Sequence, residues 1–282
     1  MRTILTLSCT DRPGIVAAVA TFLADHHCNI IESAQFDDMD TGRFFMRVVC
    51  EPVVEGVLHD ALRRDFAPVA ERFAMDWQLR DASERLRVMI LVSKQDHCLN
   101  DLLYRYKVGA LPMEPVAIVS NHRDSYQLAA AYNIPFHHLP VTPATKPAQE
   151  AKLWALVDDY GVELVVLARY MQILSGDLAR KLEGRAINIH HGLLPSFKGA
   201  RPYHQAHARG VKLVGATAHY VTGNLDEGPI IEQEVARVEY NMRADDLVAL
   251  GRDVECQALA RAVRGHLEHR VFLNGQKTVV FR

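Results

Sequence analysis

The chain has 282 residues, of which 49% are hydrophobic, and its 32 Lys and Arg residues nearly balance its 34 Asp and Glu residues. A formal net charge of -2 and a pI near 6.7 provide no bulk attraction to nucleic-acid phosphates or to anionic membranes, so a small-molecule partner is favoured. This length and apolar content favour two domains over one.

The cysteines and the first residues indicate the compartment. The chain has five cysteines, an odd number without any Cys-x-x-Cys pair, so neither a disulfide framework nor a structural zinc cluster is expected: Cys9, Cys28, Cys50, Cys98 and Cys256. The short apolar run after Met1 lacks the features of a signal peptide, and no stretch is long and apolar enough to span a bilayer. We expect reduced thiols, no membrane contact and a cytoplasmic location.

Residues 1–83 are predicted to form the first domain. Strand-like patterns cover residues 3–9, 29–36, 43–50 and 76–79, and helical patterns cover residues 14–27 and 53–74. The order βαββαβ predicts a ferredoxin-like unit, with residues 38–42 as the turn of its central hairpin.

Two short segments of this unit, residues 10–16 and 27–30, resemble the start of an ACT domain. The resemblance implies a homo-oligomer and an amino-acid effector such as glycine or methionine. Gly14 permits close approach at the start of a helix, where free backbone N–H groups can receive a carboxylate. The alternative is that Asp11 caps this helix and Pro13 occupies its first turn, with no ligand at all. The implied effector residues are Asp11, Gly14, Ile15, Asn29 and Ile30.

Residues 84–282 are predicted to form the second domain. Strand-like patterns at residues 86–92, 116–120, 162–167, 186–190 and 216–221 alternate with helical patterns at residues 124–132, 149–160 and 177–182. Strands and helices at this spacing predict right-handed crossovers and a Rossmann-like core with a mostly parallel sheet. A long helix at residues 244–268 and a hairpin at residues 270–281, turning at Asn274-Gly275, complete the chain.

Polar side chains gather where the strand at residues 186–190 ends. Asn188 and His190 are two positions apart, so both project to one side of that strand, and Asp226 follows in a turn-forming segment. The Asn amide can stabilise an oxyanion, His can transfer a proton near neutrality and Asp can orient a water. Such a trio suits attack on a carbonyl carbon. Taken singly, each residue also fits a structural role: a turn cap, a satisfied core histidine and a polar turn.

Taken together, these residues resemble the folate-dependent formyltransferase family. Its marks are Asn188-Ile189-His190, then the loop at residues 194–199, then Leu225-Asp226-Glu227-Gly228-Pro229, and a similar segment lies at residues 167–175. The resemblance implies that Asn188, His190 and Asp226 are catalytic and that no metal or further cofactor is needed. It also implies substrate-binding residues, which are Met171, Gln172, Ile173, Leu174, Val221 and Arg201.

The turn at residues 93–98 bears on the acceptor of the formyl group. A phosphorylated ribonucleotide acceptor needs a glycine-rich cradle of backbone N–H groups there, and this turn has no glycine. With no organic acceptor, the remaining nucleophile is water. The whole chain, with its ACT-like start, resembles the formyltetrahydrofolate deformylases. This implies hydrolysis of 10-formyltetrahydrofolate to formate and tetrahydrofolate, which supplies formate for purine synthesis and balances the one-carbon folate pool.

Two alternatives stay open at this point. One is a formyl transferase that uses 10-formyltetrahydrofolate and an unidentified amine acceptor, and the other is a non-catalytic sensor of amino acids and folate. A zinc site at His204 and His207 is rejected, because no third ligand is near in sequence. Cys98 is interpreted as a structural cysteine.

Overall fold

The computed structural model describes residues 2–56, 58–195 and 202–282. The chain divides into two compact units. The first comprises Met1–Glu84 with the short segments Glu268–Phe272 and Val279–Arg282, and the second comprises Arg85–Leu267 with Leu273–Thr278.

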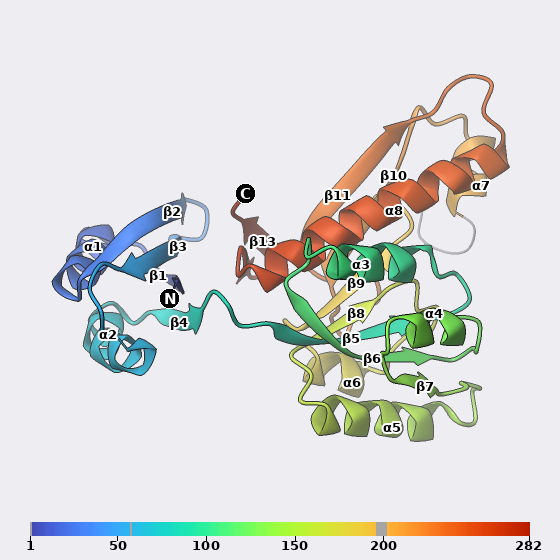
Figure 1. Cartoon of the computed structure of the whole chain (residues 1–282). Coiled ribbons are helices and arrows are strands. Elements are labelled where there is room, and N and C mark those ends of the chain that lie inside the picture. Colours follow the sequence, from blue (N-terminus) through green and yellow to red (C-terminus); the bar gives the residue numbers. More distant parts are fainter. Residues whose placement is uncertain (1, 57, 196–201) are drawn as a thin grey trace. The chain divides into compact units, whose positions relative to one another are not determined.

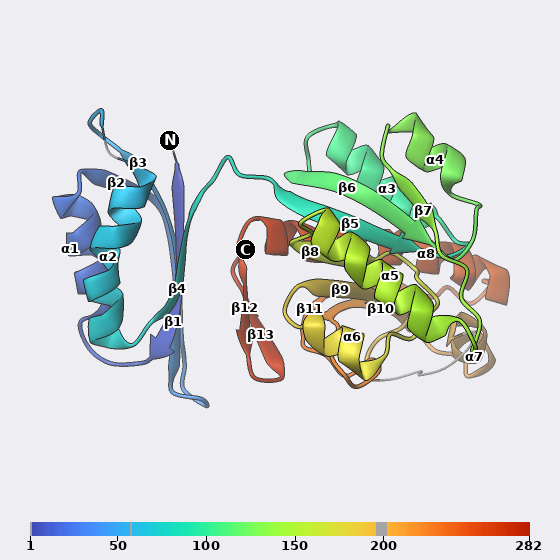
Figure 2. The same cartoon turned by 90° about the horizontal axis from the view of Figure 1, so that it is seen from below.

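The first unit has the predicted βαββαβ order. Its four-stranded antiparallel sheet has the strand order β2-β3-β1-β4, and both helices lie on one face (Figure 2). The elements are β1 (Thr3–Thr10), α1 (Ile15–Asp25), β2 (Cys28–Asp38), β3 (Arg43–Pro52), α2 (His59–Phe73) and β4 (Asp76–Asp81). The ferredoxin-like prediction is confirmed.

The helix predicted at residues 53–74 is too long at its start. Helix α2 begins at His59, because the backbone N–H of Val53 donates to the His27 carbonyl and Gly56 adopts a left-handed φ of 91°. Both features keep residues 53–56 in turns. Apolar periodicity alone did not reveal this break.

The end of the chain packs on β3 in the first unit. Strand β3 is buried on both faces, and its Phe45 ring lies edge-on against Phe272, with centroids 5.8 Å apart. Arg47 is buried and donates to the Glu268 carbonyl at 3.1 Å and to Glu32 at 2.9 Å. These contacts explain why residues far apart in sequence form one compact unit.

The second unit is built on a seven-stranded sheet of order β11-β10-β9-β8-β5-β6-β7. Its strands are β5 (Leu86–Val92), β6 (Met113–Ser120), β7 (Phe136–His138), β8 (Leu164–Leu167), β9 (Ala186–His190), β10 (Leu213–Tyr220) and β11 (Ile230–Arg237). Its helices are α3 (His97–Lys107), α4 (Tyr126–Ala131), α5 (Lys146–Asp159), α6 (Gly176–Lys181), α7 (Pro202–Ala208) and α8 (Ala244–Leu267). The final hairpin consists of β12 (Val271–Asn274) and β13 (Lys277–Val280).

The mostly parallel sheet confirms the prediction. Strands β5 to β9 run parallel, whereas β10 runs antiparallel to β9 and β11 antiparallel to β10. The sequence patterns did not reveal α3, β7 or β11. Strand β7 is three residues long, and β11 has three consecutive polar residues, Glu232-Gln233-Glu234, at its centre, so neither has the continuous apolar run of a buried strand.

Helices cover both faces of this sheet, with α3 and α8 on one side and α5 and α6 on the other (Figures 1 and 2). Met89 and Leu91 of β5 face Leu153 and Val157 of α5 in one core cluster. Alternate residues of the same strand are also buried, so β5 is covered on both faces, as expected for the centre of a parallel sheet.

The strand order reverses beside β5. From β5 the chain builds β6 and β7 on one side, and it then returns to build β8 and β9 on the other. The two loops that follow β5 and β8 therefore leave in opposite directions. This reversal creates the crevice in which open α/β sheets bind ligands, at the carboxyl ends of the strands.

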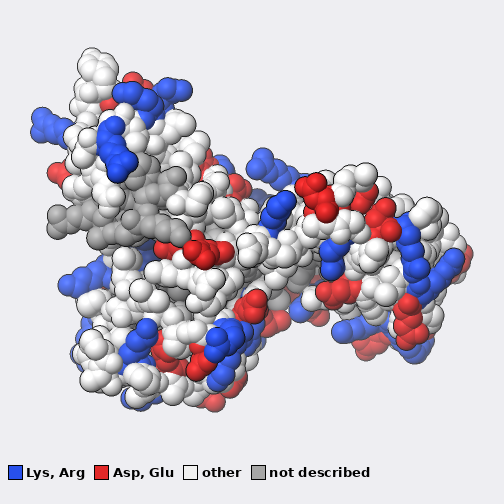
Figure 3. Space-filling view, turned by 180° about the vertical axis from the view of Figure 1, so that it is seen from behind, with Lys and Arg blue, Asp and Glu red and all other residues white. Residues whose placement is uncertain are grey.

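Surface charge follows the near-neutral composition. Basic and acidic side chains are intermixed on the face shown in Figure 3. In the part of the chain that the structure describes, every helix is too short or too polar to cross a membrane.

Candidate active site

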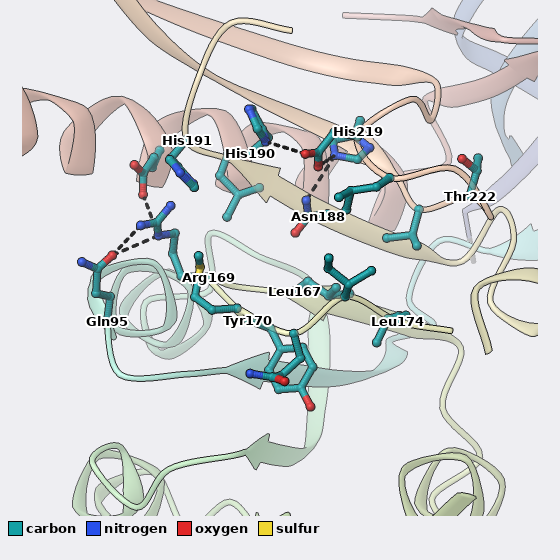
Figure 4. Close-up of a pocket in the computed structure, with 18 of the residues that line it drawn as sticks. Gln95, Leu167, Arg169, Tyr170, Leu174, Asn188, His190, His191, His219 and Thr222 are labelled. Atoms are coloured by element: carbon teal, nitrogen blue, oxygen red, sulfur yellow. Dashed lines mark hydrogen bonds and ion pairs between the residues drawn. The ribbon is translucent and has the colours of Figure 1, made fainter. Parts of the chain in front are cut away.

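A cavity of about 630 Å³ opens at the carboxyl ends of β8 and β9 (Figure 4). One half is apolar and is lined by Leu167 at the end of β8, by Leu174 and by Val221, which follows β10. The other half is polar and contains Gln95, Arg169 and His191 together with Glu255 and Tyr203, and Arg252 also lines the cavity. Asn188, His190 and His219 lie between the two halves, and Asp226, which contacts His190, also lines the cavity.

The structure brings the three residues of the predicted trio together. Asn188 and His190 line the cavity from the same strand, β9, as their alternation predicts. Asp226 comes from the loop after β10, where its backbone is left-handed with a φ of 56°. Its Oδ2 lies 3.3 Å from Nδ1 of His190. An amide, an imidazole and a carboxylate therefore converge on one point of the cavity.

The contact with His190 keeps Asp226 ionised. The hydrogen bond from His190 lowers the pKa of the Asp226 carboxyl below its usual value, although partial burial opposes this effect. The other ring nitrogen of His190, Nε2, is buried and has no hydrogen-bond partner among the described residues. The pair thus offers a permanent carboxylate and an uncommitted imidazole nitrogen.

His219 is a fourth member of this group, and the sequence analysis missed it. It lies directly opposite Asn188 in the antiparallel pairing of β9 and β10. Burial lowers the pKa of His219, so the ring is neutral near pH 7. Its Nδ1 donates to the Tyr220 carbonyl at 2.9 Å, which leaves Nε2 to accept from Nδ2 of Asn188 at 3.2 Å. His219 therefore orients the Asn188 amide and leaves one N–H of that amide free. The sequence signal that could have indicated His219 is a polar residue within an otherwise apolar-rich strand.

The predicted substrate-binding residues of the second unit lie at the apolar half. Met171, Gln172, Ile173, Leu174 and Val221 all line the cavity, and the side chains of Met171 and Ile173 are more than half exposed at its rim. Arg201 lies outside the described residues.

Ser93 anchors the segment that follows β8. Its hydroxyl accepts from the Met171 backbone N–H at 2.9 Å and donates to Asn121 at 2.7 Å. Ser93 is buried, and Gln95 is the residue of the turn at 93–98 that reaches the cavity. The side chain of Ser93 thus holds the segment that follows β8.

The polar half contains a buried charge network centred on Arg169. Nε and Nη2 of Arg169 donate to Oε1 of Gln95 at 3.1 and 2.6 Å, and Nε lies 3.4 Å from Oε2 of Glu255. Glu255, on α8, also accepts from His97 at 2.7 Å and from the Tyr203 hydroxyl at 2.9 Å. Burial alone would raise the pKa of Glu255, but His97, Arg169 and Tyr203 hold it below its usual value, so Glu255 is a carboxylate.

His191 lies between this network and the trio. Its ring stacks on that of His190, with centroids 5.3 Å apart and planes inclined by 17°. Burial, and then the positive charge of Arg169, lower the pKa of His191 to about 4. His191 is therefore a neutral wall of the cavity at physiological pH.

The predicted effector residues lie at the start of α1 and of β2. Gly14 is the N-cap of α1 with a φ of 96°, and within the described residues no side chain caps this helix. Asp11 is exposed and its backbone N–H donates to the Gly42 carbonyl, so Asp11 does not cap α1. Asn29 is exposed, Ile30 is half-buried and Ile15 belongs to the core. Their effector role stays a prediction.

Three side chains near the polar half, His97, Cys98 and Cys256, place possible metal-ligand atoms within 4.8 Å of one another. His97 already contacts Glu255 through Nε2. The contact with Cys256 and burial raise the pKa of the Cys98 thiol well above its usual value, so this thiol is protonated. All five cysteines are free thiols.

Comparisons with known proteins agree with this architecture. The family model described as formyl transferase matches residues 86–263, and the ACT domain model matches residues 3–60. A formyltetrahydrofolate deformylase from Corynebacterium sp. (strain P-1) is 55% identical to this chain, over 100% of the chain and 99% of that relative.

Solved structures extend the comparison. The crystal structure of the formyltetrahydrofolate deformylase from Burkholderia mallei matches with a TM-score of 0.96 and 55% identity, over 100% of this chain and 99% of that one. The glycinamide ribonucleotide transformylase 1 from Symbiobacterium toebii matches with a TM-score of 0.65 and 31% identity, over 70% of this chain and 95% of that one. The chain therefore belongs to the formyltetrahydrofolate deformylase family, in which an ACT domain precedes a formyl transferase domain.

Proposed function

We propose that this protein hydrolyses 10-formyltetrahydrofolate to formate and tetrahydrofolate in the cavity of its second unit. The observation that carries the proposal is the convergence of Asn188, His190 and the ionised Asp226 between an apolar half and a polar half. Its membership of the deformylase family names the substrate.

The apolar half suits the flat pterin ring of the folate. Leu167, Leu174 and Val221 supply apolar surface, and Met171, Gln172 and Ile173 line the cavity beside them. With the pterin there, the formyl group lies between Asn188 and His190. Arg201 is proposed to contribute to folate binding from outside the described residues.

Asp226 and Asn188 divide the work on the formyl group. The Asp226 carboxylate accepts a hydrogen bond from a water and positions its oxygen for attack on the formyl carbon. The N–H of Asn188 that His219 leaves free then stabilises the oxyanion of the tetrahedral intermediate.

His190 completes the reaction. The bond between the formyl carbon and N10 breaks, and N10 receives a proton from His190. Water thus supplies the hydroxyl of formic acid and, through His190, the hydrogen on N10. Formic acid loses its proton at neutral pH, so the products are formate and tetrahydrofolate.

The direct test is incubation of the purified protein with 10-formyltetrahydrofolate alone. Formate and tetrahydrofolate should appear in equal amounts. Asn188→Ala should lower turnover by about a hundredfold or more, since loss of one oxyanion donor has an effect of that size. Asp226→Asn should lower turnover by about a hundredfold or more, because a positioned acid–base group contributes an effect of that size. A folded variant with wild-type turnover would contradict the role given to that residue.

The same assay separates the two alternatives. A formyl transferase with an unidentified amine acceptor would release formate only slowly in the absence of an amine. Once an amine is added, it would formylate that amine. A sensor without catalytic activity would release none. The convergence of three chemically complementary groups favours an enzyme over a sensor.

We further propose that formate from this reaction supplies purine synthesis and that the reaction balances the one-carbon folate pool. The free thiols suit the reducing cytoplasm. The match to the ACT domain model supports an amino-acid effector such as glycine or methionine, bound in a homo-oligomer at Asp11, Gly14, Ile15, Asn29 and Ile30.

A further inference from the structure

The fold of the second unit does not by itself decide between water and an amine as the nucleophile. The transformylase from Symbiobacterium toebii, which is named for transfer to a glycinamide ribonucleotide, shares this fold over 70% of the chain. Side chains lining the cavity must therefore make the choice. The inference below rests on the proposed function and concerns those side chains.

Among the described residues, the polar half of the cavity faces the formyl group in the proposed binding mode. With the pterin in the apolar half, a nucleophile would reach the formyl carbon from the side of Arg169 and His191 (Figure 4). This half opens to solvent at Gln95, which is exposed. An amine acceptor would have to enter past Gln95 and displace or pass the guanidinium group behind it.

Arg169 is fixed in this path from three directions. Its backbone follows β8 in the left-handed region, with a φ of 63°, a conformation that disfavours residues with a Cβ and suits glycine. Gln95 and Glu255 hold its guanidinium from the turn after β5 and from α8. The side chain is only 10% exposed. The chain thus places a large, buried cation where a glycine would be less strained.

The other contacts of Glu255 hold the Arg169 guanidinium rigidly in this position. The Glu255 carboxylate is fixed by His97 and by Tyr203, so it cannot turn away from Arg169 without losing two further hydrogen bonds. The neutral ring of His191 closes the side that faces the trio. A positive charge there also repels a protonated amine from the cavity.

We propose that Arg169 is a specificity-determining residue, which fills the polar half of the cavity so that water, and not a primary amine, reaches the formyl group. Arg169 acts by exclusion and touches none of the reacting atoms. Gln95 and Glu255 are the positioning residues that hold it. Removal of its side chain would open a path from solvent to the formyl carbon.

The experiment supplies Arg169→Gly with 10-formyltetrahydrofolate and glycinamide, a small primary amine. In the new reaction the amine nitrogen bonds to the formyl carbon, the bond from that carbon to N10 breaks, the amine loses one proton and N10 gains one. N-formylglycinamide and formate are quantified together by mass spectrometry. Glycine suits the backbone at position 169, and Glu255 keeps His97 and Tyr203, so the variant should fold.

The ratio of N-formylglycinamide to formate should rise by about tenfold or more over the wild type, which is the range that a change in pocket contacts gives. Arg252→Ala is the matched control, because it removes a positive charge from the lining of the same cavity but keeps the Arg169 guanidinium that Gln95 and Glu255 hold. Its product ratio should stay at the wild-type value. A rise of equal size in the control would show that charge alone excludes the amine, and would overturn the proposal.

A second variant covers the case in which Arg169→Gly does not fold. Gln95→Ala changes an exposed residue and frees one side of the guanidinium, so a smaller rise of the same ratio is expected. Wild-type product ratios in folded Arg169→Gly, or in Gln95→Ala if that alone folds, would overturn the proposal. Formate release by the wild type without any amine tests the proposed function separately, because that measurement does not depend on Arg169 variants.

Discussion

At the scale of single residues, the site depends on how one side chain restricts another. Asn188 has two N–H groups, and His219 binds one of them because burial keeps its imidazole neutral and the Tyr220 carbonyl fixes its tautomer. The remaining N–H then has a defined direction. An oxyanion donor that is held in advance needs no reorganisation in the transition state.

This arrangement predicts the effect of replacing His219. His219→Ala should lower kcat for formate release by about tenfold to a hundredfold, because a misdirected donor loses much of its value, with KM little changed. His219→Gln, which can still accept from Asn188, should recover part of the loss. His137→Ala is the control, since His137 lies on β7 and contacts Tyr160. Equal kcat values for all four proteins would show that Asn188 does not need His219.

Residue patterns predicted only part of this site. The alternation in β9 placed Asn188 and His190 on one side, whereas Asp226 joined them through resemblance to a family. His219, Arg169 and Glu255 were missed, because their partners come from other strands and helices. The pairing of Asn188 with His219 depends on the register of β10, which no local pattern encodes.

At the scale of elements, the loop between β10 and β11 is held by close backbone contact. Gly228 lies so near Tyr220 that a Cβ at this position would overlap the Tyr220 carbonyl oxygen and lie 3.2 Å from Nδ1 of His219. The Tyr220 backbone N–H also donates to the Pro229 carbonyl at 2.9 Å. Gly228 thus allows this loop to bring Asp226 up to His190.

Gly228→Ala should therefore damage both the loop and the site. We expect a loss of stability of about 1–3 kcal/mol, typical of overpacking, and a fall in formate release of about tenfold or more as Asp226 moves. Thermal denaturation and initial rates measure the two effects. Gly223→Ala is the matched control in the same loop, because a Cβ there meets nothing within 4 Å, and its melting temperature should equal that of the wild type. Unchanged stability and rate in Gly228→Ala would show that the loop adapts.

In the sheet of the second unit, some strands are predicted by their own residues, whereas another forms only through its pairing with a distant strand. Apolar-rich runs predicted β5, β6, β8, β9 and β10, since strands buried on both faces are rich in apolar residues. Strand β11 lies at the sheet edge and has three consecutive polar residues at its centre. Only its pairing with β10 shows that this segment is a strand.

At the scale of the whole molecule, the first unit is an ACT domain, since the ACT domain model matches residues 3–60. Its helix α1 begins at Gly14 without a side-chain cap among the described residues, and Asn29 is exposed at the start of β2. These features support the proposed amino-acid effector and the proposed homo-oligomer.

This proposal predicts two properties of the full chain. Sedimentation equilibrium should give a mass of at least a dimer, and glycine or methionine should raise the melting temperature, because a ligand that binds the folded state stabilises it. Asn29→Ala should remove the shift in melting temperature, and lysine serves as the control amino acid. A monomeric protein whose melting temperature ignores both glycine and methionine would contradict the proposal.

The sequence by itself determined the order of the elements in the first unit, the parallel core of the second and the strand that carries Asn188 and His190. These properties follow from periodicity and turn residues, which act over a few neighbouring positions. The tertiary structure decided which distant residues meet: Asp226 with His190, His219 with Asn188, Arg169 with Glu255, and residues 268–272 with the first unit. Such contacts depend on strand register and on the packing of α8. Both arise only when the whole core forms, so no short stretch of sequence contains them.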